Sequence, residues 1–270
     1  MNTIFSKQRK TVSKNQKNEY MIESHPNMRI FMDQSKLFFI MGLGRGGTSI
    51  FQEIMNTFDG FDNIGESRIG GQDGMSCYAY VLKNNDFSYL DNYILSTWTS
   101  KYYVEKTPNS LLCLPQMAQH YPNANFLFLE RNPYLTLLSV MNMHPPGIKD
   151  EKKRKYDIEA GNIEPEELSL NYEQHRAKQI LKMVEAQVCH KQLFQNQMSI
   201  RYETLVKEPE LIIDKIATKF NLISNINLVR QVLSRPSYSS MQNTYEIKEL
   251  IDQEAINMIR KACRLWNYEF

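Results

Sequence analysis

One segment of the chain combines glycines, hydroxyl groups and an arginine at close spacing. It reads Gly42-Leu43-Gly44-Arg45-Gly46-Gly47-Thr48-Ser49, between a short apolar run and a run with apolar residues at helical spacing. In a loop that joins a strand to a helix, backbone N–H groups converge on an anion at the positive end of the helix dipole. Hydroxyl groups and an arginine add donors and positive charge. The segment therefore predicts an anion-binding loop made of Gly44, Arg45, Gly46, Gly47, Thr48 and Ser49.

Two familiar phosphate sites fit this loop only in part. A dinucleotide fingerprint would use Gly42, Gly44 and Gly47, but it needs a second strand that ends in an acid about twenty residues later, and 59–63 has no strand character. A nucleoside triphosphate loop has a lysine after its last glycine, where this chain has Thr48. Without that lysine the outer phosphates lack a counter-charge. A P-loop nucleotide kinase that depends on magnesium is therefore a lesser alternative.

The elements that must position this loop alternate along the chain. Strands are expected at 37–41, 102–104, 126–129 and 198–202, and helices at 50–58, 111–120, from 133 onward, at 172–196, at 209–220 and at 246–265. Such alternation implies a parallel sheet that is covered by helices on both faces. The predicted fold class is therefore α/β, a three-layer α/β/α domain with a central parallel sheet.

The composition is that of an ordinary globular protein. Of 270 residues 42% are hydrophobic, and 32 basic against 30 acidic side chains give a net charge of +2, which offers no support for a nucleic-acid partner. No apolar stretch has the ~18 residues of a membrane helix, and no signal peptide begins the chain, so we expect no membrane partner. The four cysteines lie far apart, and the histidines have no metal-ligand spacing. These features predict a cytoplasmic protein without a metal.

Two stretches depart from the alternating pattern. Residues 1–35 are basic at their start and poor in large apolar groups, so they predict a flexible N-terminal segment. The single domain is expected at 36–270. Within it, 149–167 passes from four consecutive basic residues to an acidic stretch with a proline, which indicates a surface insertion or lid.

Four motifs of the chain resemble those of one enzyme family. The loop at 42–49 is similar to the 5′-phosphosulfate-binding loop of sulfotransferases that use 3′-phosphoadenosine 5′-phosphosulfate (PAPS). The family's strand-end, 3′-phosphate and R-Y-E-x-L-V motifs have their counterparts in Tyr103-Val104-Glu105-Lys106-Thr107-Pro108, in 126–133 with Ser139, and in 201–206 with Pro209-Glu210. The motifs occur in family order, in a style similar to the tyrosylprotein, heparan-type and bacterial branches. The resemblance implies a P-loop NTPase-like sulfotransferase fold, with PAPS as donor and adenosine 3′,5′-bisphosphate (PAP) as product.

The resemblance also implies roles for the strand-end residues. Arg131 and Ser139, eight residues apart at the start of a helix, would hold the 3′-phosphate. Lys106 would be the catalytic cation that stabilises charge on the leaving phosphate oxygen. Tyr202 matches a family tyrosine near the nucleotide, although core packing is an equal alternative. Without the resemblance, Lys106 and Arg131 would be read as solvated surface residues.

The acceptor needs a general base, and the motifs offer two candidates. Aryl and steroid sulfotransferases have a histidine two positions after this lysine, where the chain has Pro108. Gly65-Glu66-Ser67-Arg68-Ile69 resembles the G-E-x-x-R stretch of the tyrosylprotein branch, so Glu66 is the first candidate and an exposed loop carboxylate is the alternative. Arg68 would orient Glu66 or bind substrate. His144, beside two prolines, is the reserve base at the acceptor pocket.

Together these features predict transfer of a sulfonate group from PAPS to a hydroxyl of a small-molecule acceptor, with an amine or amide nitrogen as a lesser possibility. The alternative from another class is a catalytically inactive regulatory module that binds PAPS or PAP. The acceptor's identity and the oligomeric state are not indicated by the sequence.

Overall fold

The computed structural model of the chain describes residues 32–61, 77–143, 158, 164–234 and 251–270, which belong to one compact unit, Met32–Phe270. Nearly all of the N-terminal segment predicted at 1–35 lies outside the described residues. Most of the insertion predicted at 149–167 also lies outside them.

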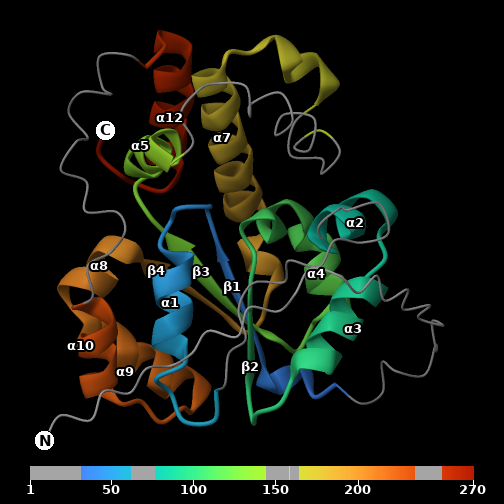
Figure 1. The fold of residues 1–270 in the computed structure, drawn as a ribbon, viewed down its shortest axis with the longest axis vertical. Helices are drawn as coiled ribbons and strands as arrows, with labels where there is room; N and C mark the ends of the chain where they lie inside the picture. Colours follow the sequence, from blue (N-terminus) through green and yellow to red (C-terminus); the bar gives the residue numbers. More distant parts are fainter. Residues whose placement is uncertain (1–31, 62–76, 144–157, 159–163, 235–250) are drawn as a thin grey trace, which may run out of the picture. The chain divides into compact units, whose positions relative to one another are not determined.

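A parallel sheet of four strands forms the centre of the described structure (Figure 1). Its strands are β1 Leu37–Gly42, β2 Tyr103–Lys106, β3 Asn125–Glu130 and β4 Gln197–Arg201, in the order β2-β1-β3-β4. Every residue of β1, β2 and β3 is buried. Strands covered on both faces read as continuous apolar runs, which is why the sequence signalled β1 and β3 clearly.

Helices cover both faces of the sheet and bury its alternating side chains. Phe39 and Met41 of β1 belong to one hydrophobic cluster, and Phe38 and Ile40 belong to the other. The first cluster draws on α2 Cys77–Asn84, α3 Ser88–Thr97, η3 Pro108–Cys113, α4 Leu114–His120, α5 Pro133–Met143, α7 Tyr172–His190 and α12 Gln253–Leu265. The second draws on α1 Thr48–Met55, α8 Tyr202–Lys207, α9 Pro209–Phe220 and α10 Ile226–Leu233. The predicted three-layer α/β/α fold is thereby confirmed.

Three short 3-10 helices complete the described elements: η2 Gln34–Lys36, η4 Pro165–Ser169 and η5 Lys191–Leu193. In Figure 1, α2 to α4 lie to one side of the sheet and α8 to α10 to the other, while α5, α7 and α12 gather beyond one end of it. Helix α7 packs along α12 and α5.

Most predicted elements are present, with shifted ends. Helix α9 has the predicted bounds, and α5 begins at Pro133 as expected. The helix expected at 172–196 was predicted six residues too long, since α7 ends at His190. The chain turns after this residue, so that Phe194 packs on Phe126 and Phe128. The strand expected to end at Tyr202 ends at Arg201. Helices α2, α3, α8 and α10 were not predicted; α8 follows β4 without a turn signal.

Candidate functional site

The order of the strands brings three predicted segments to one edge of the sheet. Strand β1 pairs with β2 on one side, Ile40 opposite Lys106, and with β3 on the other, Gly42 opposite Leu129. Adjacent strands lie about 4.8 Å apart. The loop after β1 therefore lies between the carboxyl ends of β2 and β3. In open α/β sheets, ligands bind at the carboxyl ends of two adjacent strands whose connections run to opposite sides of the sheet.

The loop itself adopts backbone conformations that depend on its glycines. Gly47 has φ of 91°, in the left-handed region that favours glycine, and serves as the N-cap of α1 without a side-chain cap. A Cβ added to Gly47 would lie 2.4 Å from the ring of Tyr202. A Cβ at Gly46 would lie 2.8 Å from the Leu43 carbonyl oxygen, which accepts the Gly46 N–H at 2.9 Å. The backbone is thus turned tightly at the helix start, as an anion-binding loop requires.

Lys106 lies beside this loop. It is the last residue of β2, whereas the strand was expected to end at Val104, and it is only 2% exposed. Its Nζ donates to the Ser49 Oγ at 3.1 Å. Lysine is almost never fully buried unless it is paired, so the solvated surface lysine considered above is wrong. The structure places the ammonium at the start of α1, beside the loop.

Arg131 lies on the other side of the loop. It follows β3 directly and is 8% exposed, so the surface arginine considered above is also wrong. Its Nη1 donates to the Arg45 carbonyl oxygen at 2.7 Å, and its guanidinium lies over the Tyr202 ring, 4.9 Å from the centroid. Its buried Nε has no hydrogen-bond partner among the described residues. A buried donor without a partner is costly, and an anion would satisfy it.

Electrostatics at Arg131 point the same way. Burial lowers the pKa of its guanidinium, and the neighbouring charge of Arg45 acts in the same direction. Tyr202 and Glu203 raise this pKa, and each has a larger effect than Arg45. Two guanidinium groups held close together repel each other, and a bound dianion would relieve that repulsion.

Ser139 and Arg45 connect the loop to helix α5. The Asn132 side chain accepts the N–H groups of Tyr134 and Leu135 and so caps this helix. Ser139 lies two turns farther along and is 4% exposed. Its Oγ accepts a hydrogen bond from the Arg45 Nε at 3.3 Å. Arg45, Arg131 and Ser139 therefore form one cluster, although the sequence analysis assigned Arg45 to a different clamp.

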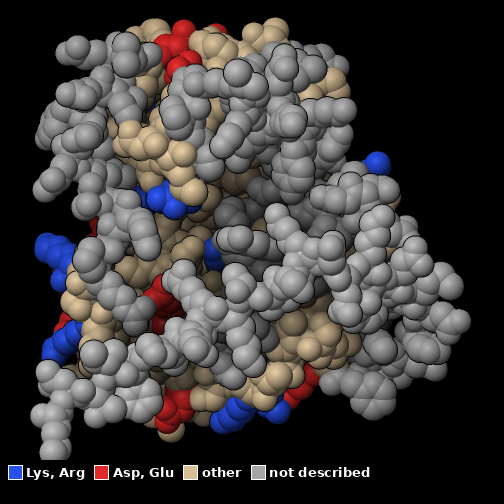
Figure 2. Space-filling view, viewed as in Figure 1, with Lys and Arg blue, Asp and Glu red and all other residues tan. Residues whose placement is uncertain are grey.

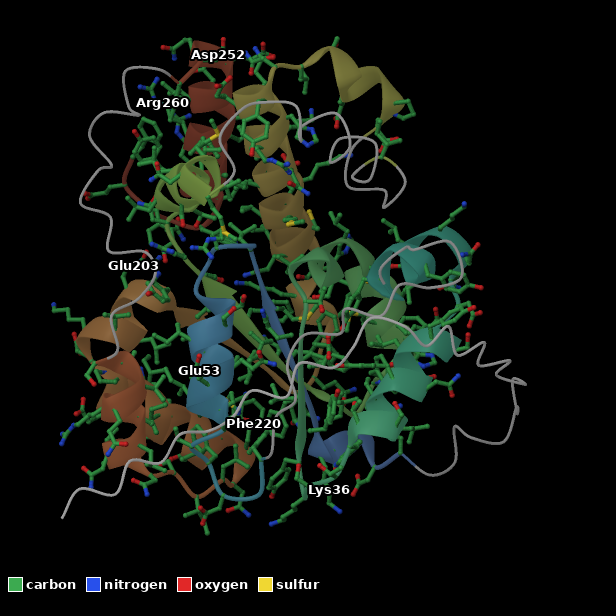
Figure 3. The ribbon with its side chains drawn as sticks, in the orientation of Figure 1. Lys36, Glu53, Glu203, Phe220, Asp252 and Arg260 are labelled. Atoms are coloured by element: carbon green, nitrogen blue, oxygen red, sulfur yellow. The ribbon has the colours of Figure 1, made fainter. Side chains whose placement is uncertain are left out.

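Glu203 and the end of the chain support this cluster, and sequence reasoning missed both. The Glu203 carboxylate accepts the Asn132 backbone N–H at 3.0 Å and the Tyr268 hydroxyl at 2.7 Å. The same hydroxyl lies 3.1 Å from the Glu130 carbonyl oxygen. In Figure 3, Glu203 lies at the end of the sheet away from Lys36 and Phe220. The R-Y-E motif was a signal for this glutamate, but nothing in the sequence indicates its partner.

Three predicted residues lie outside the described residues: Glu66, Arg68 and His144. The two candidate bases are among them, so the identity of the base stays a prediction. The described residues do include Tyr202, which contacts both Arg131 and the position of Gly47. The three described cysteines, Cys113, Cys189 and Cys263, are free.

The surface and the remaining described residues add three observations. Basic atoms are visible near the middle of the face drawn in Figure 2. Within the described ranges, no group of three or more His, Cys, Asp or Glu could hold a metal ion, and no helix there has the length and apolar character to span a bilayer. The absence of a metal requirement stays a prediction.

The chain belongs to the sulfotransferase family. Residues 66–223, more than half of the chain, match the model described as "Sulfotransferase family". The matched region contains Lys106, Arg131, Ser139 and Tyr202 and begins after the glycine-rich loop. No curated protein matches the sequence. The predicted family is confirmed.

Solved sulfotransferase structures are similar to the chain at low identity. A sulfotransferase domain from the curacin biosynthetic pathway is 14% identical, with a TM-score of 0.49, over 86% of this chain and 98% of that one. A sulfotransferase from Alicyclobacillus acidocaldarius is 13% identical, with a TM-score of 0.46, over 86% of this chain and 96% of that one. Mouse sulfotransferase SULT7A1, solved in complex with PAP, is 15% identical, with a TM-score of 0.46, over 90% of this chain and 82% of that one.

Proposed function

We propose that the chain transfers a sulfonate group from PAPS to a hydroxyl of a small-molecule acceptor and releases PAP. The observation that carries this proposal is the convergence of Lys106, Arg45 and Arg131 around one glycine-rich loop at the carboxyl edge of the sheet. PAPS carries anionic groups at two ends of one nucleotide. Basic groups on both sides of the loop suit such a ligand.

The loop and its neighbours would divide the donor between them. The backbone N–H groups at the start of α1, together with the Thr48 and Ser49 hydroxyls, would hold the 5′-phosphosulfate. Arg131 and Ser139 would hold the 3′-phosphate, because the buried Arg131 Nε has a donor to offer and Arg45 links Arg131 to the Ser139 hydroxyl. Tyr202 would keep the Arg131 guanidinium in place through the contact of its ring with that group.

Lys106 would act on the leaving group. The acceptor oxygen attacks sulfur, the bond from sulfur to the bridging phosphate oxygen breaks, and the electron pair goes to PAP. A buried ammonium stabilises that developing charge more strongly than a solvated one, because little water competes for it. Its hydrogen bond to Ser49 holds it beside the loop that would carry the phosphosulfate.

The acceptor must also lose a proton. In this proposal Glu66 takes that proton as the attacking bond forms, with His144 as the alternative base and Arg68 as the residue that orients Glu66 or binds the acceptor. A hydroxyl acceptor, a cytoplasmic location and independence from a metal belong to the same proposal. The missing lysine at Thr48 disfavours ATP as the donor.

The test is a screen of the purified full chain with PAPS against mixed metabolites, without added metal, read by mass spectrometry as gain of one sulfonate group. The proposal expects at least one modified acceptor and stoichiometric formation of PAP. Tight binding of PAP with no transfer to any acceptor would instead support a regulatory module. Consumption of ATP that requires magnesium, with no use of PAPS, would contradict the proposal.

A further inference from the structure

Arg45 lies in the phosphate loop but reaches beyond it. Its Nε donates to Ser139 on α5 at 3.3 Å, and its carbonyl oxygen accepts a hydrogen bond from Arg131 at 2.7 Å. Both ends of this residue are therefore tied to the two groups that the proposed function places on the ribose 3′-phosphate. No described contact ties its guanidinium to the start of α1.

The backbone at Arg45 is unusual for its residue type. Its φ of 67° lies in the left-handed region, which costs an L residue other than glycine about 1–2 kcal/mol. Such a conformation persists where its surroundings hold it, and it is common at ligand sites. Here the contacts to Arg131 and Ser139 hold it. A glycine could adopt this conformation without cost, as could those on both sides of Arg45. The presence of an arginine at this position therefore indicates that its side chain is needed there.

Charge gives a second, independent argument. Burial lowers the pKa of the Arg131 guanidinium and the charge of Arg45 adds to this effect, while Arg131 retains a buried Nε without a partner among the described residues. The Arg45 side chain contacts Ser139, and its carbonyl oxygen accepts a hydrogen bond from Arg131, so the two guanidinium groups and the hydroxyl belong to one cluster. A phosphate monoester carries negative charge and enough oxygens to accept from all three side chains.

We propose that Arg45 binds the 3′-phosphate of the nucleotide together with Arg131 and Ser139, and that this loop arginine makes the site selective for nucleotides with a ribose 3′-phosphate. This inference rests on the proposed function and deepens it. The 5′ end is then left to the loop N–H groups, the hydroxyls at its end and Lys106. One residue thus links the two clamps, so filling the 3′-phosphate site also orders the loop that holds the 5′ end.

The experiment compares three ligands by calorimetry: adenosine 3′,5′-bisphosphate, adenosine 3′-monophosphate and adenosine 5′-monophosphate. The variant is Arg45→Asn, because asparagine tolerates the left-handed conformation while it removes the guanidinium. Arg230→Asn is the matched control, since Arg230 of α10 is exposed and pairs with the exposed Glu210 of α9. Urea unfolding of each variant establishes that it is folded.

The result expected for Arg45→Asn is a loss of about 10- to 100-fold in affinity for both ligands with a 3′-phosphate, the range for charged hydrogen bonds. Its affinity for adenosine 5′-monophosphate should change less than about 3-fold. Arg230→Asn should leave the affinity for all three ligands unchanged. Equal losses for all three ligands would show that Arg45 serves the 5′ end and would overturn the inference. Unchanged binding of all three would overturn it as well.

A double variant adds a test that does not depend on the 5′-monophosphate. If Arg45 and Ser139 hold the same phosphate, the losses from Arg45→Asn and Ser139→Ala should not add, whereas separate sites would give additive losses and contradict the inference. Failure of the unaltered chain to bind the bisphosphate at all would refute the proposed function itself, which is a different result from either outcome above.

Discussion

Replacing Gly47 by alanine tests how the loop and the arginine cluster depend on each other. The new Cβ would lie 2.4 Å from two ring atoms of Tyr202, so the ring must move. The centroid of that ring lies 4.9 Å from the Cζ atom of the Arg131 guanidinium. A single methyl group in the loop should therefore disturb the proposed 3′-phosphate site through Tyr202, without touching Arg131 directly.

The size of the effect follows from two separate costs. An alanine at φ of 91° pays about 1–2 kcal/mol for the left-handed conformation. Moving a packed aromatic ring adds about 1–3 kcal/mol. The free energy of unfolding should thus fall by about 2–5 kcal/mol. Loss of the contact between Arg131 and the Tyr202 ring, about 0.5–2 kcal/mol, corresponds to a drop in bisphosphate affinity of about 2- to 30-fold.

Gly60→Ala is the matched control. Gly60 has φ of 87°, so alanine there has the same backbone strain, but its Cβ would meet Lys101 and Tyr102 at a more tolerable 3.1 Å. Gly60 also lies near the start of β2, away from the loop, because its carbonyl oxygen accepts the Tyr102 N–H. Gly60→Ala should lose about 1–2 kcal/mol of stability and keep its affinity for the bisphosphate.

The assays are urea unfolding and calorimetric titration with adenosine 3′,5′-bisphosphate on both variants. The reasoning is refuted if Gly47→Ala is no less stable than Gly60→Ala and binds the bisphosphate as tightly. A further check is Gly47→Ala combined with Tyr202→Ala, which removes the clash. That double variant should recover part of the stability lost by Gly47→Ala without recovering affinity.

Two further expectations concern the support of the site and the stability of the C-terminal helix. Tyr268→Phe removes the hydroxyl that donates to Glu203 and lies near the Glu130 carbonyl. The free energy of unfolding in urea should therefore fall by about 1–3 kcal/mol. An unchanged unfolding midpoint would contradict that role. Asp252 caps α12, and its hydrogen bond from Gln174 lowers its pKa. A lowered pKa stabilises the fold above the ordinary pKa near 4 and loses that contribution as the pH falls, so stability measured from pH 6 to pH 3 should decline more for the unaltered chain than for Asp252→Asn.

The strands and the segments at their ends could be predicted because burial on both faces leaves a direct record in the sequence. Leu37 to Met41 and Phe126 to Leu129 are apolar without interruption; Gly42 follows the first run directly, and Glu130 and Arg131 follow the second. Parallel strands place such ends along one edge of a sheet. This pattern predicts where a ligand would bind, but the roles of Lys106 and Arg131 came from the resemblance to the sulfotransferase motifs, since the pattern alone would leave both as solvated surface residues.

The cluster around Arg45 could not be predicted, since it depends on a backbone angle and on an approach of distant elements. The sequence does not reveal that Arg45 has a positive φ or that its side chain meets Ser139, 94 residues later. The contact between Tyr268 and Glu203 spans 65 residues in the same way. Helices α2 and α3 were missed because Tyr78, Val81, Leu90 and Ile94 are buried apolar residues among polar ones with a weak helical pattern.

The central claim is that the buried Lys106 stabilises the leaving group, and the most direct test measures the rate of PAPS conversion without that lysine. Single-turnover conversion of PAPS to PAP, with an acceptor mixture, should be compared for the unaltered chain, Lys106→Met and Lys101→Met, after all three are shown to bind PAP. Lys106 is buried beside Ser49, whereas Lys101 is exposed. The account predicts a rate about 100- to 1,000-fold lower for Lys106→Met and an unchanged rate for Lys101→Met. Equal rates for the two variants, or no conversion by the unaltered chain, would contradict it.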